Sequence, residues 1–318
     1  MKLGGGKQEP SAHSYPELTL NENGDSFHDV ELRAENGDAE SQTRLALLYE
    51  IGEEVAQDFE EAFRWVQTAA DQGYAPAMSN LGYLYEHGRG IEASIENALT
   101  WYKKAAEKQY AGAQCNLGYM YENGLGVEKD IAKADEYYRI AAEQEHPGAQ
   151  VAIGNMYANG EGVEVNFLLA EKWYRKAAAN NYAKAEFNLG LLFEMKEWPH
   201  HNPVEAGKWY GRATEKGVAR AQLNLGSLHL VGTGVPQDYV LAHMFFNLAA
   251  SKGLANAVKL RNTVAKVMSD VQIAEAQSRA RGWQPTPSSR GKMQGETSKD
   301  SSGAQDRSES QKGPRSTR

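Results

Sequence analysis

Three features of the sequence have residue types and spacing that could support chemistry. Gly124 and Gly126 form a Gly-x-Gly in the stretch LGYMYENGLGV, and glycine pairs of this kind can hold phosphate groups. His200 and His201 are adjacent in EWPHHNP and are candidate metal ligands. Cys115 is the single cysteine of the 318-residue chain. What each feature does depends on the elements that carry it.

The Gly-x-Gly is not unique, and this decides how it is interpreted. A nucleotide-binding loop needs a strand before it, and a Walker loop ends in Gly-Lys followed by Ser or Thr. Neither signal is present. Each pair instead follows a helical pattern and precedes Ile or Val, so we interpret the glycines as turns in which a left-handed residue ends a helix. The pairs are Gly88/Gly90, Gly124/Gly126, Gly160/Gly162 and Gly232/Gly234.

The recurrence belongs to an internal repeat of 36 residues. YAPAMSNLGYLYEHGRGIEASIENALTWYKKAAEKQ starts at Tyr74, and similar segments start without gaps at Tyr110 and His146. The register extends over six units from Asp38 to Gly253, whose residues we number as positions 1 to 36. Each unit holds two amphipathic helical patterns, and two short helices cannot bury both apolar stripes alone. Stacked neighbouring units would close the core.

The repeated segment LGYLYEHGRGIEASIENALTWYKKAAEKQ resembles a unit of the Sel-one-like repeat (SLR) family, relatives of the tetratricopeptide repeats. The family pattern is roughly A-x-x-x-L-G-x-x-Y-x-x-G-x-G-V, a charged stretch, then A-x-x-W-Y-x-K-A-A-x-x-G. SDVQIAEAQSRARGW is also similar to the terminal segment of bacterial members. The resemblance covers about two thirds of the chain. It implies an all-α fold, a right-handed α/α solenoid of stacked helix-turn-helix repeats, and adaptor work in signalling or assembly.

Composition divides the chain into five parts. The tail has no Val, Ile, Leu or aromatic residue, so it cannot bury enough surface to order itself, and a basic contact segment is the alternative. The divergent unit before it has the polar character of a solenoid cap. We expect a poorly ordered segment at 1–26, a partial capping helix at 27–37, six repeats at 38–253, a divergent capping repeat at 254–283 and a disordered tail at 284–318.

Charge and hydropathy limit the possible partners and compartments. The net charge is −8; residues 284–318 carry +3, so the rest carries −11 and would repel phosphate backbones. No stretch approaches eighteen apolar residues, and no apolar segment of a signal peptide follows Lys2. One cysteine fits a reducing compartment. We therefore expect a cytoplasmic monomer that binds protein, with no nucleic acid, membrane insertion, metal or cofactor.

Glycine also recurs at position 9, inside the first helical pattern of the unit. A glycine in a helix interior costs roughly 1 kcal/mol relative to alanine, so some compensation is expected. We predict that another helix approaches closely where a Cβ would not fit. The residues are Gly82, Gly118, Gly154, Gly190 and Gly226, with Ala46 in the first unit.

The remaining chemical candidates have modest alternatives. Cys115, at position 6, is expected on a face away from the core as a free surface thiol. His200 and His201 are adjacent in a loop and should point apart, so an exposed turn is favoured over a metal site. In the fifth unit, Trp198 lies where four of the other units have the second glycine. It is either a packing residue for the altered turn or an exposed aromatic anchor for a partner.

The first helix of each unit also suggests a binding face. A helical wheel places positions 6, 10 and 13 opposite the core stripe, and these positions vary most between units. Aromatic and acidic residues there would suit a partner segment with basic and apolar residues; a solvated face is the alternative. The candidate partner-binding residues, with Trp198, are Ser79, Tyr83, Glu86, Tyr119, Glu122, Asn155, Phe187, Leu191 and Glu194.

Two other functional classes compete with a non-catalytic adaptor. Some secreted SLR proteins are implied by the resemblance to bind or weakly hydrolyse β-lactams, but they carry a cysteine pair in each unit, and this chain has one cysteine in total. A regulator associated with an envelope partner would need targeting information that the sequence does not show. We therefore expect the adaptor, with no catalytic residues.

Overall fold

The computed structural model describes residues 25–52 and 54–286, and every regular element in these ranges is a helix. The predictions for 1–26 and 284–318 fall almost entirely outside the described residues. The helices are α1 (Phe27–Glu35), α2 (Ala39–Ile51), α3 (Phe59–Asp71), α4 (Ala75–His87), α5 (Ile95–Glu107), α6 (Ala111–Asn123), α7 (Ile131–Glu143), α8 (Pro147–Asn159), α9 (Phe167–Ala179), α10 (Ala183–Glu194), α11 (Pro203–Glu215), α12 (Ala219–Val231), α13 (Tyr239–Ser251), α14 (Ala255–Ala265) and α15 (Asp270–Gly282).

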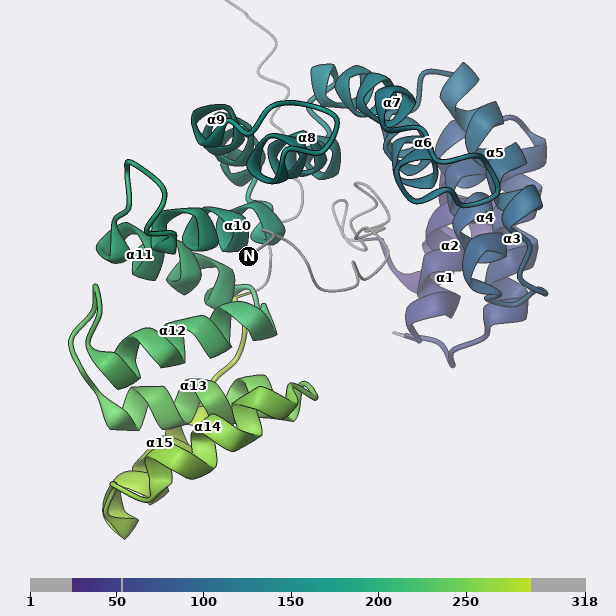
Figure 1. Ribbon diagram of the computed structural model, residues 1–318. Helices are drawn as coiled ribbons and strands as arrows, with labels where there is room; N and C mark the ends of the chain where they lie inside the picture. Colours follow the sequence, from purple (N-terminus) through teal and green to yellow (C-terminus); the bar gives the residue numbers. More distant parts are fainter. Residues whose placement is uncertain (1–24, 53, 287–318) are drawn as a thin grey trace, which may run out of the picture.

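Helices α2 to α13 form six pairs, as the 36-residue period predicts, and stack into the right-handed α/α solenoid that the family resemblance implies (Figure 1). Even-numbered helices are the first helices of the repeats and odd-numbered ones the second. In Figure 1 the stack curves into an arc, with α6, α8 and α10 on its inner side and α7, α9 and α11 on its outer side. Each first helix packs against the second helix of its own repeat and that of the preceding repeat.

Local sequence fixes where the helices begin and end. Five first helices end at a glycine in the left-handed conformation, which confirms the interpretation of the turn. A short polar residue precedes each second helix, and its side-chain oxygen accepts a backbone N–H of the first turn. The terminating glycines are Gly52, Gly88, Gly124, Gly160 and Gly232. The polar residues are Asp58, Ser94, Asp130, Asn166, Asn202 and Asp238.

The glycine at position 9 lies against an aromatic ring from the second helix of the same repeat. A Cβ on Gly118 would lie 2.6 Å from Cδ1 of Tyr138, whose side chain is buried. The predicted close approach is therefore confirmed, and its partner is a ring. The pairs are Gly82–Tyr102, Gly118–Tyr138, Gly154–Tyr174, Gly190–Tyr210 and Gly226–Phe246. In the first repeat Ala46 and the smaller Val66 replace them in one buried cluster.

Additional helices cover both ends of the stack. Val30 of α1 packs with Leu45 of α2, and Ala276 of α15 lies in the same buried cluster as Phe245 of α13. The chain then returns to the C-terminal end of α11, where the Thr286 N–H donates to the carbonyl oxygen of Glu215 over 2.7 Å. None of the described helices combines the length and apolarity needed to cross a bilayer.

Candidate partner-binding face

Three of the four glutamates at position 13 are hydrogen-bonded to the second helices. In three repeats a buried tyrosine hydroxyl donates to one carboxylate oxygen, which orients the carboxylate at the end of the first helix. The helical wheel predicts this position on the face opposite the core, whereas the hydrogen bond ties it to the second helix of the same repeat. The pairs are Tyr102–Glu86 at 2.8 Å, Tyr138–Glu122 at 2.6 Å and Tyr210–Glu194 at 2.6 Å.

The sixth repeat changes both members of this pair, and the fourth repeat keeps the tyrosine but changes the acceptor. In the sixth repeat Phe246 has no hydroxyl and position 13 is Leu230. In the fourth repeat position 13 is Ala158, and the Tyr174 hydroxyl donates instead to Oδ1 of Asn155 over 2.7 Å. Glycine, ring and hydrogen-bond acceptor therefore form one unit of packing within a repeat.

Burial changes the acid–base behaviour of these pairs. Desolvation raises the pKa of Glu122, and the hydrogen bond from Tyr138 opposes this only in part. Burial and the nearby Glu122 charge raise the pKa of Tyr138 well above its usual value, so its hydroxyl remains a donor at neutral pH. The arrangement places a partly desolvated carboxylate at the surface with one oxygen engaged.

The predicted face is only partly accessible. Tyr83, Tyr119, Glu86, Glu122 and Leu191 are half-buried, and Glu194 is exposed. Ser79, Asn155 and Phe187 are buried, so the expectation that position 6 faces solvent is wrong. The helical wheel assumed one core stripe, whereas each first helix contacts two second helices and at least one neighbouring first helix.

Cys115 is also at position 6, and it is also buried. Its side chain packs with Tyr138 and Ile153 and is only 4% exposed, so the expected surface thiol is wrong. Burial raises the pKa of the Cys115 thiol to about 12. The thiol therefore stays protonated at neutral pH, where it is a poor nucleophile.

Trp198 is a packing residue, which excludes the exposed-anchor alternative. Its side chain is 3% exposed and meets the ring of Phe167 edge-on, with 5.6 Å between ring centroids. Phe167 begins the second helix of the preceding repeat. In the third repeat the glycine equivalent to Trp198, Gly126, lies against Ile95, which begins α5. The indole thus occupies a contact between repeats that glycine makes elsewhere.

The histidine pair lies at the surface of the same turn. Nδ1 of His200 is 3.6 Å from a carboxylate oxygen of Glu171, and its ring is 4.7 Å from that of Trp198. His201 is exposed. Within residues 25–52 and 54–286, no three His, Cys, Asp or Glu residues converge as metal ligands.

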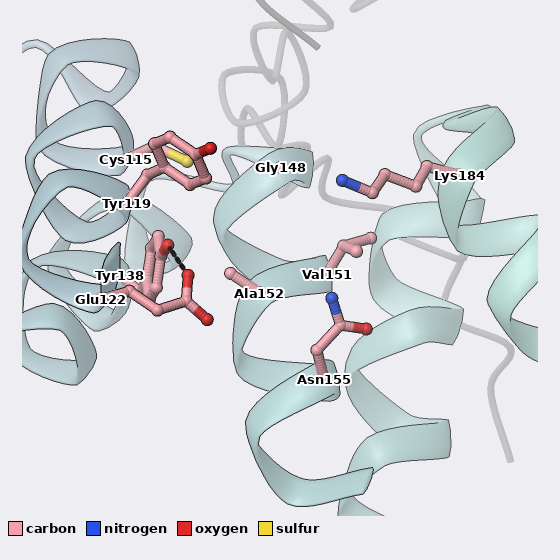
Figure 2. Close-up of a pocket in the computed structure, with 9 residues that line it drawn as sticks. All are labelled: Cys115, Tyr119, Glu122, Tyr138, Gly148, Val151, Ala152, Asn155 and Lys184. Carbon is pink, nitrogen blue, oxygen red and sulfur yellow. Dashed lines mark hydrogen bonds between the residues drawn. The ribbon is translucent and has the colours of Figure 1, made fainter. Parts of the chain in front are cut away.

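A pocket between α6 and α8 joins several of these residues on one face (Figure 2). Ala152 and Lys184 were missed as site residues. The signal for Ala152 was in the repeats, because position 7 is asparagine in four other units. The lining residues are Cys115, Tyr119, Glu122, Tyr138, Gly148, Val151, Ala152, Asn155 and Lys184.

The protein belongs to the Sel1 repeat family, because the family model matches six consecutive segments of the chain. Proteins of this family are generally protein-interaction scaffolds. No curated protein matches the sequence. The matched segments are residues 39–74, 75–110, 111–146, 147–182, 183–218 and 219–254.

Solved structures give the same assignment. A protective antigen with an SLR fold, present in uropathogenic Escherichia coli strains, is 32% identical with a TM-score of 0.61. The match covers 81% of this chain but 56% of the antigen, so this chain spans little more than half its length. A Sel1 repeat protein from Oxalobacter formigenes is 30% identical with a TM-score of 0.62, covering 78% of this chain and 98% of that one. An immunity protein from Pseudomonas aeruginosa shares the fold, with 22% identity and a TM-score of 0.51. That match covers 67% of this chain and 81% of the immunity protein.

Proposed function

We propose that this protein is a non-catalytic scaffold that binds a partner segment with basic and apolar side chains along its first helices, in signalling or complex assembly. The binding surface is the concave strip, which we define by its accessible residues. These are Tyr83, Glu86, Tyr119, Glu122, Leu191 and Glu194.

The observation that carries the proposal is the set of tyrosine-bonded carboxylates at position 13. Each of Glu86, Glu122 and Glu194 has one oxygen held by a hydroxyl from the core. A carboxylate that is already oriented loses little side-chain entropy when a cation binds, so more of the interaction energy appears as affinity. Half-buried tyrosines beside two of these glutamates add apolar contact area and resemble the aromatic residues that dominate interfaces.

The first two repeats contain an internal example of this recognition. The guanidinium of Arg89 lies over the ring of Tyr83, 5.1 Å from its centroid, and forms an ion pair with Glu50 at position 13. Tyr83 and Glu50 thus hold a basic side chain through an aromatic face and a carboxylate. Tyr119 and Glu86, the equivalent residues one repeat further along, offer the same two groups to a side chain from another molecule.

A peptide-display selection tests the proposal. We expect the purified protein to enrich peptides with Lys or Arg next to aromatic or aliphatic residues. The variant Glu86→Gln/Glu122→Gln should lose this enrichment, since glutamine removes the charge while its oxygen can still accept from the tyrosine hydroxyl.

The matched control is Glu107→Gln/Glu143→Gln, which changes the net charge equally at exposed ends of α5 and α7. This control should select the same peptides as the wild type. Equal enrichment by the wild type and the Glu86→Gln/Glu122→Gln variant would refute the concave strip as the binding surface.

A further inference from the structure

We propose that the pocket between α6 and α8 binds the carboxamide of a glutamine or asparagine side chain in the partner segment. This inference rests on the proposed function, because the pocket adjoins Tyr119 and Glu122 of the concave strip. It adds an uncharged recognition position to a partner otherwise described by basic and apolar residues.

The pocket exists because one repeat lacks a side chain that the others have. Position 7 is asparagine in the second, third, fifth and sixth repeats and Ala152 in the fourth. In the third and fifth repeats this amide bonds back to the preceding first helix. Nδ2 of Asn116 is 3.4 Å from Oγ of Ser79, and Nδ2 of Asn188 is 2.9 Å from Oδ1 of Asn155. At Ala152 no amide extends toward α6, and Figure 2 shows its methyl group facing the space between the two helices.

The missing group indicates what the space accepts. At two other junctions, α4–α6 and α8–α10, an asparagine carboxamide lies between neighbouring first helices and bonds across the interval. Between α6 and α8 the same interval is open and lined by Tyr119, Glu122 and Asn155. A carboxamide supplied by another molecule would replace the one that the repeat supplies at other interfaces.

The polar groups in the lining match both ends of a carboxamide. Oε2 of Glu122 accepts from Tyr138, so Oε1 is the remaining acceptor and lies toward the pocket in Figure 2. Oδ1 of Asn155 accepts from Tyr174 and Asn188, which leaves Nδ2 as the donor of a side chain that lines the pocket. This Nδ2 forms no hydrogen bond with any residue that the structure describes, although only 5% of Asn155 is exposed.

The charges around the pocket disfavour an ionised occupant. Glu122 lies on one wall, and the Lys184 side chain reaches toward the pocket from α10, close enough to act on the Glu122 carboxyl. A basic side chain would meet the like charge of Lys184, and an acidic one would meet that of Glu122. A neutral carboxamide can donate to Glu122 and accept from Asn155, and it avoids most of the cost of moving an ion out of water.

The test compares peptides selected by the wild type with those selected by Ala152→Asn. Asparagine is the residue of four other repeats at this position, and it should fill the pocket without changing the concave strip. We expect wild-type peptides to share a Gln or Asn at one fixed distance from their basic residues. Ala152→Asn should lose that preference and keep the basic and apolar ones, whereas Ala132→Asn, at an exposed site on α7, should keep all three.

Peptide variants give a second readout that does not depend on how the protein variant folds. In a selected peptide, replacing the carboxamide residue by Glu, Lys or Leu should weaken binding to the wild type about tenfold or more in fluorescence anisotropy, because buried polar groups are left unpaired. Basic and apolar enrichment without a carboxamide preference, or a preference unchanged in Ala152→Asn, would overturn the pocket assignment alone. Failure to enrich any peptide would overturn the proposed function and the pocket assignment together.

Discussion

The contact between Gly118 and Tyr138 makes a prediction opposite to that of helix propensity. Alanine favours a helix interior by about 1 kcal/mol over glycine, so Gly118→Ala would stabilise an isolated α6. In the protein, the new Cβ would lie 2.6 Å from the Tyr138 ring, well inside van der Waals contact. The ring is 2% exposed and its hydroxyl is bonded to Glu122, so it has little room to move.

The expected magnitude follows from three contributions. Overpacking a core costs about 1–3 kcal/mol, and a hydrogen bond to a charged group that is strained or lost costs about 1.5–3 kcal/mol. The helix gain of about 1 kcal/mol offsets part of this. We expect Gly118→Ala to lower the free energy of unfolding by about 2 kcal/mol, measured by urea denaturation with far-UV circular dichroism.

Two further variants separate the contact from the propensity. Gly211→Ala changes a glycine in α11 whose Cβ would meet nothing within 4 Å, so it should raise stability by up to about 1 kcal/mol. Gly118→Ala/Tyr138→Val recreates the Ala46 and Val66 pair of the first repeat and should be more stable than the sum of its single changes by at least about 1 kcal/mol. A stabilising Gly118→Ala, or additive effects in the double variant, would refute the reasoning.

Three other predictions concern single groups. Burial lowers the pKa of His146 to about 4, below its value in the unfolded chain, so the free energy of unfolding should fall as the pH drops from about 6.5 to 4. The variant His146→Asn keeps an acceptor for the Ala149 N–H and should remove this decrease. Urea midpoints at pH 7 and 5 measure the difference. Cys115, with its pKa near 12, should react with iodoacetamide only as fast as the protein opens, as followed by mass spectrometry. Glu186→Gln should cost about 3 kcal/mol because Lys216 loses its buried partner, and Lys216→Gln added to it should restore most of the loss in the urea midpoint.

Each of these has a contrary result. A pH dependence unchanged in His146→Asn would mean that another group titrates, and rapid alkylation of native protein would contradict a buried Cys115. The restoration at Glu186 is expected because Gln114 and Gln144 bond at the equivalent positions over 2.7 Å. A double variant no more stable than Glu186→Gln would show that a glutamine pair does not fit in the fifth repeat.

The architecture could be predicted from the sequence because the repeat presents the same pattern six times. The period set the helix pairs, and the recurrence of Gly124 and Gly126 in four units separated a helix-ending turn from a phosphate loop. The close approach at Gly118 followed from the cost of a glycine inside a helix. Each of these inferences uses local spacing, which a single chain displays directly.

The face of the first helix was harder to predict because its neighbours come from two repeats. A helical wheel with one core stripe placed Cys115 outside, whereas it lies among residues of α6, α7 and α8. The bond between Glu122 and Tyr138 joins residues 16 apart on different helices, and no local pattern shows it. The signal was the pairing across units: Tyr accompanies Glu in three repeats, and Phe246 accompanies Leu230 in the sixth.

The glycine, the ring and the acceptor all lie inside one repeat, whereas the position 7 asparagines of the third and fifth repeats bond to the repeat before them. A repeat can therefore be duplicated, deleted or moved with its own core intact, but its new neighbour determines whether the junction closes. Placing a unit with alanine at position 7 behind any other unit would open a pocket at that junction. The order of the repeats thus sets how many pockets the array has and how far apart they lie, so recombination of whole repeats could change partner preference without a single point mutation in the core.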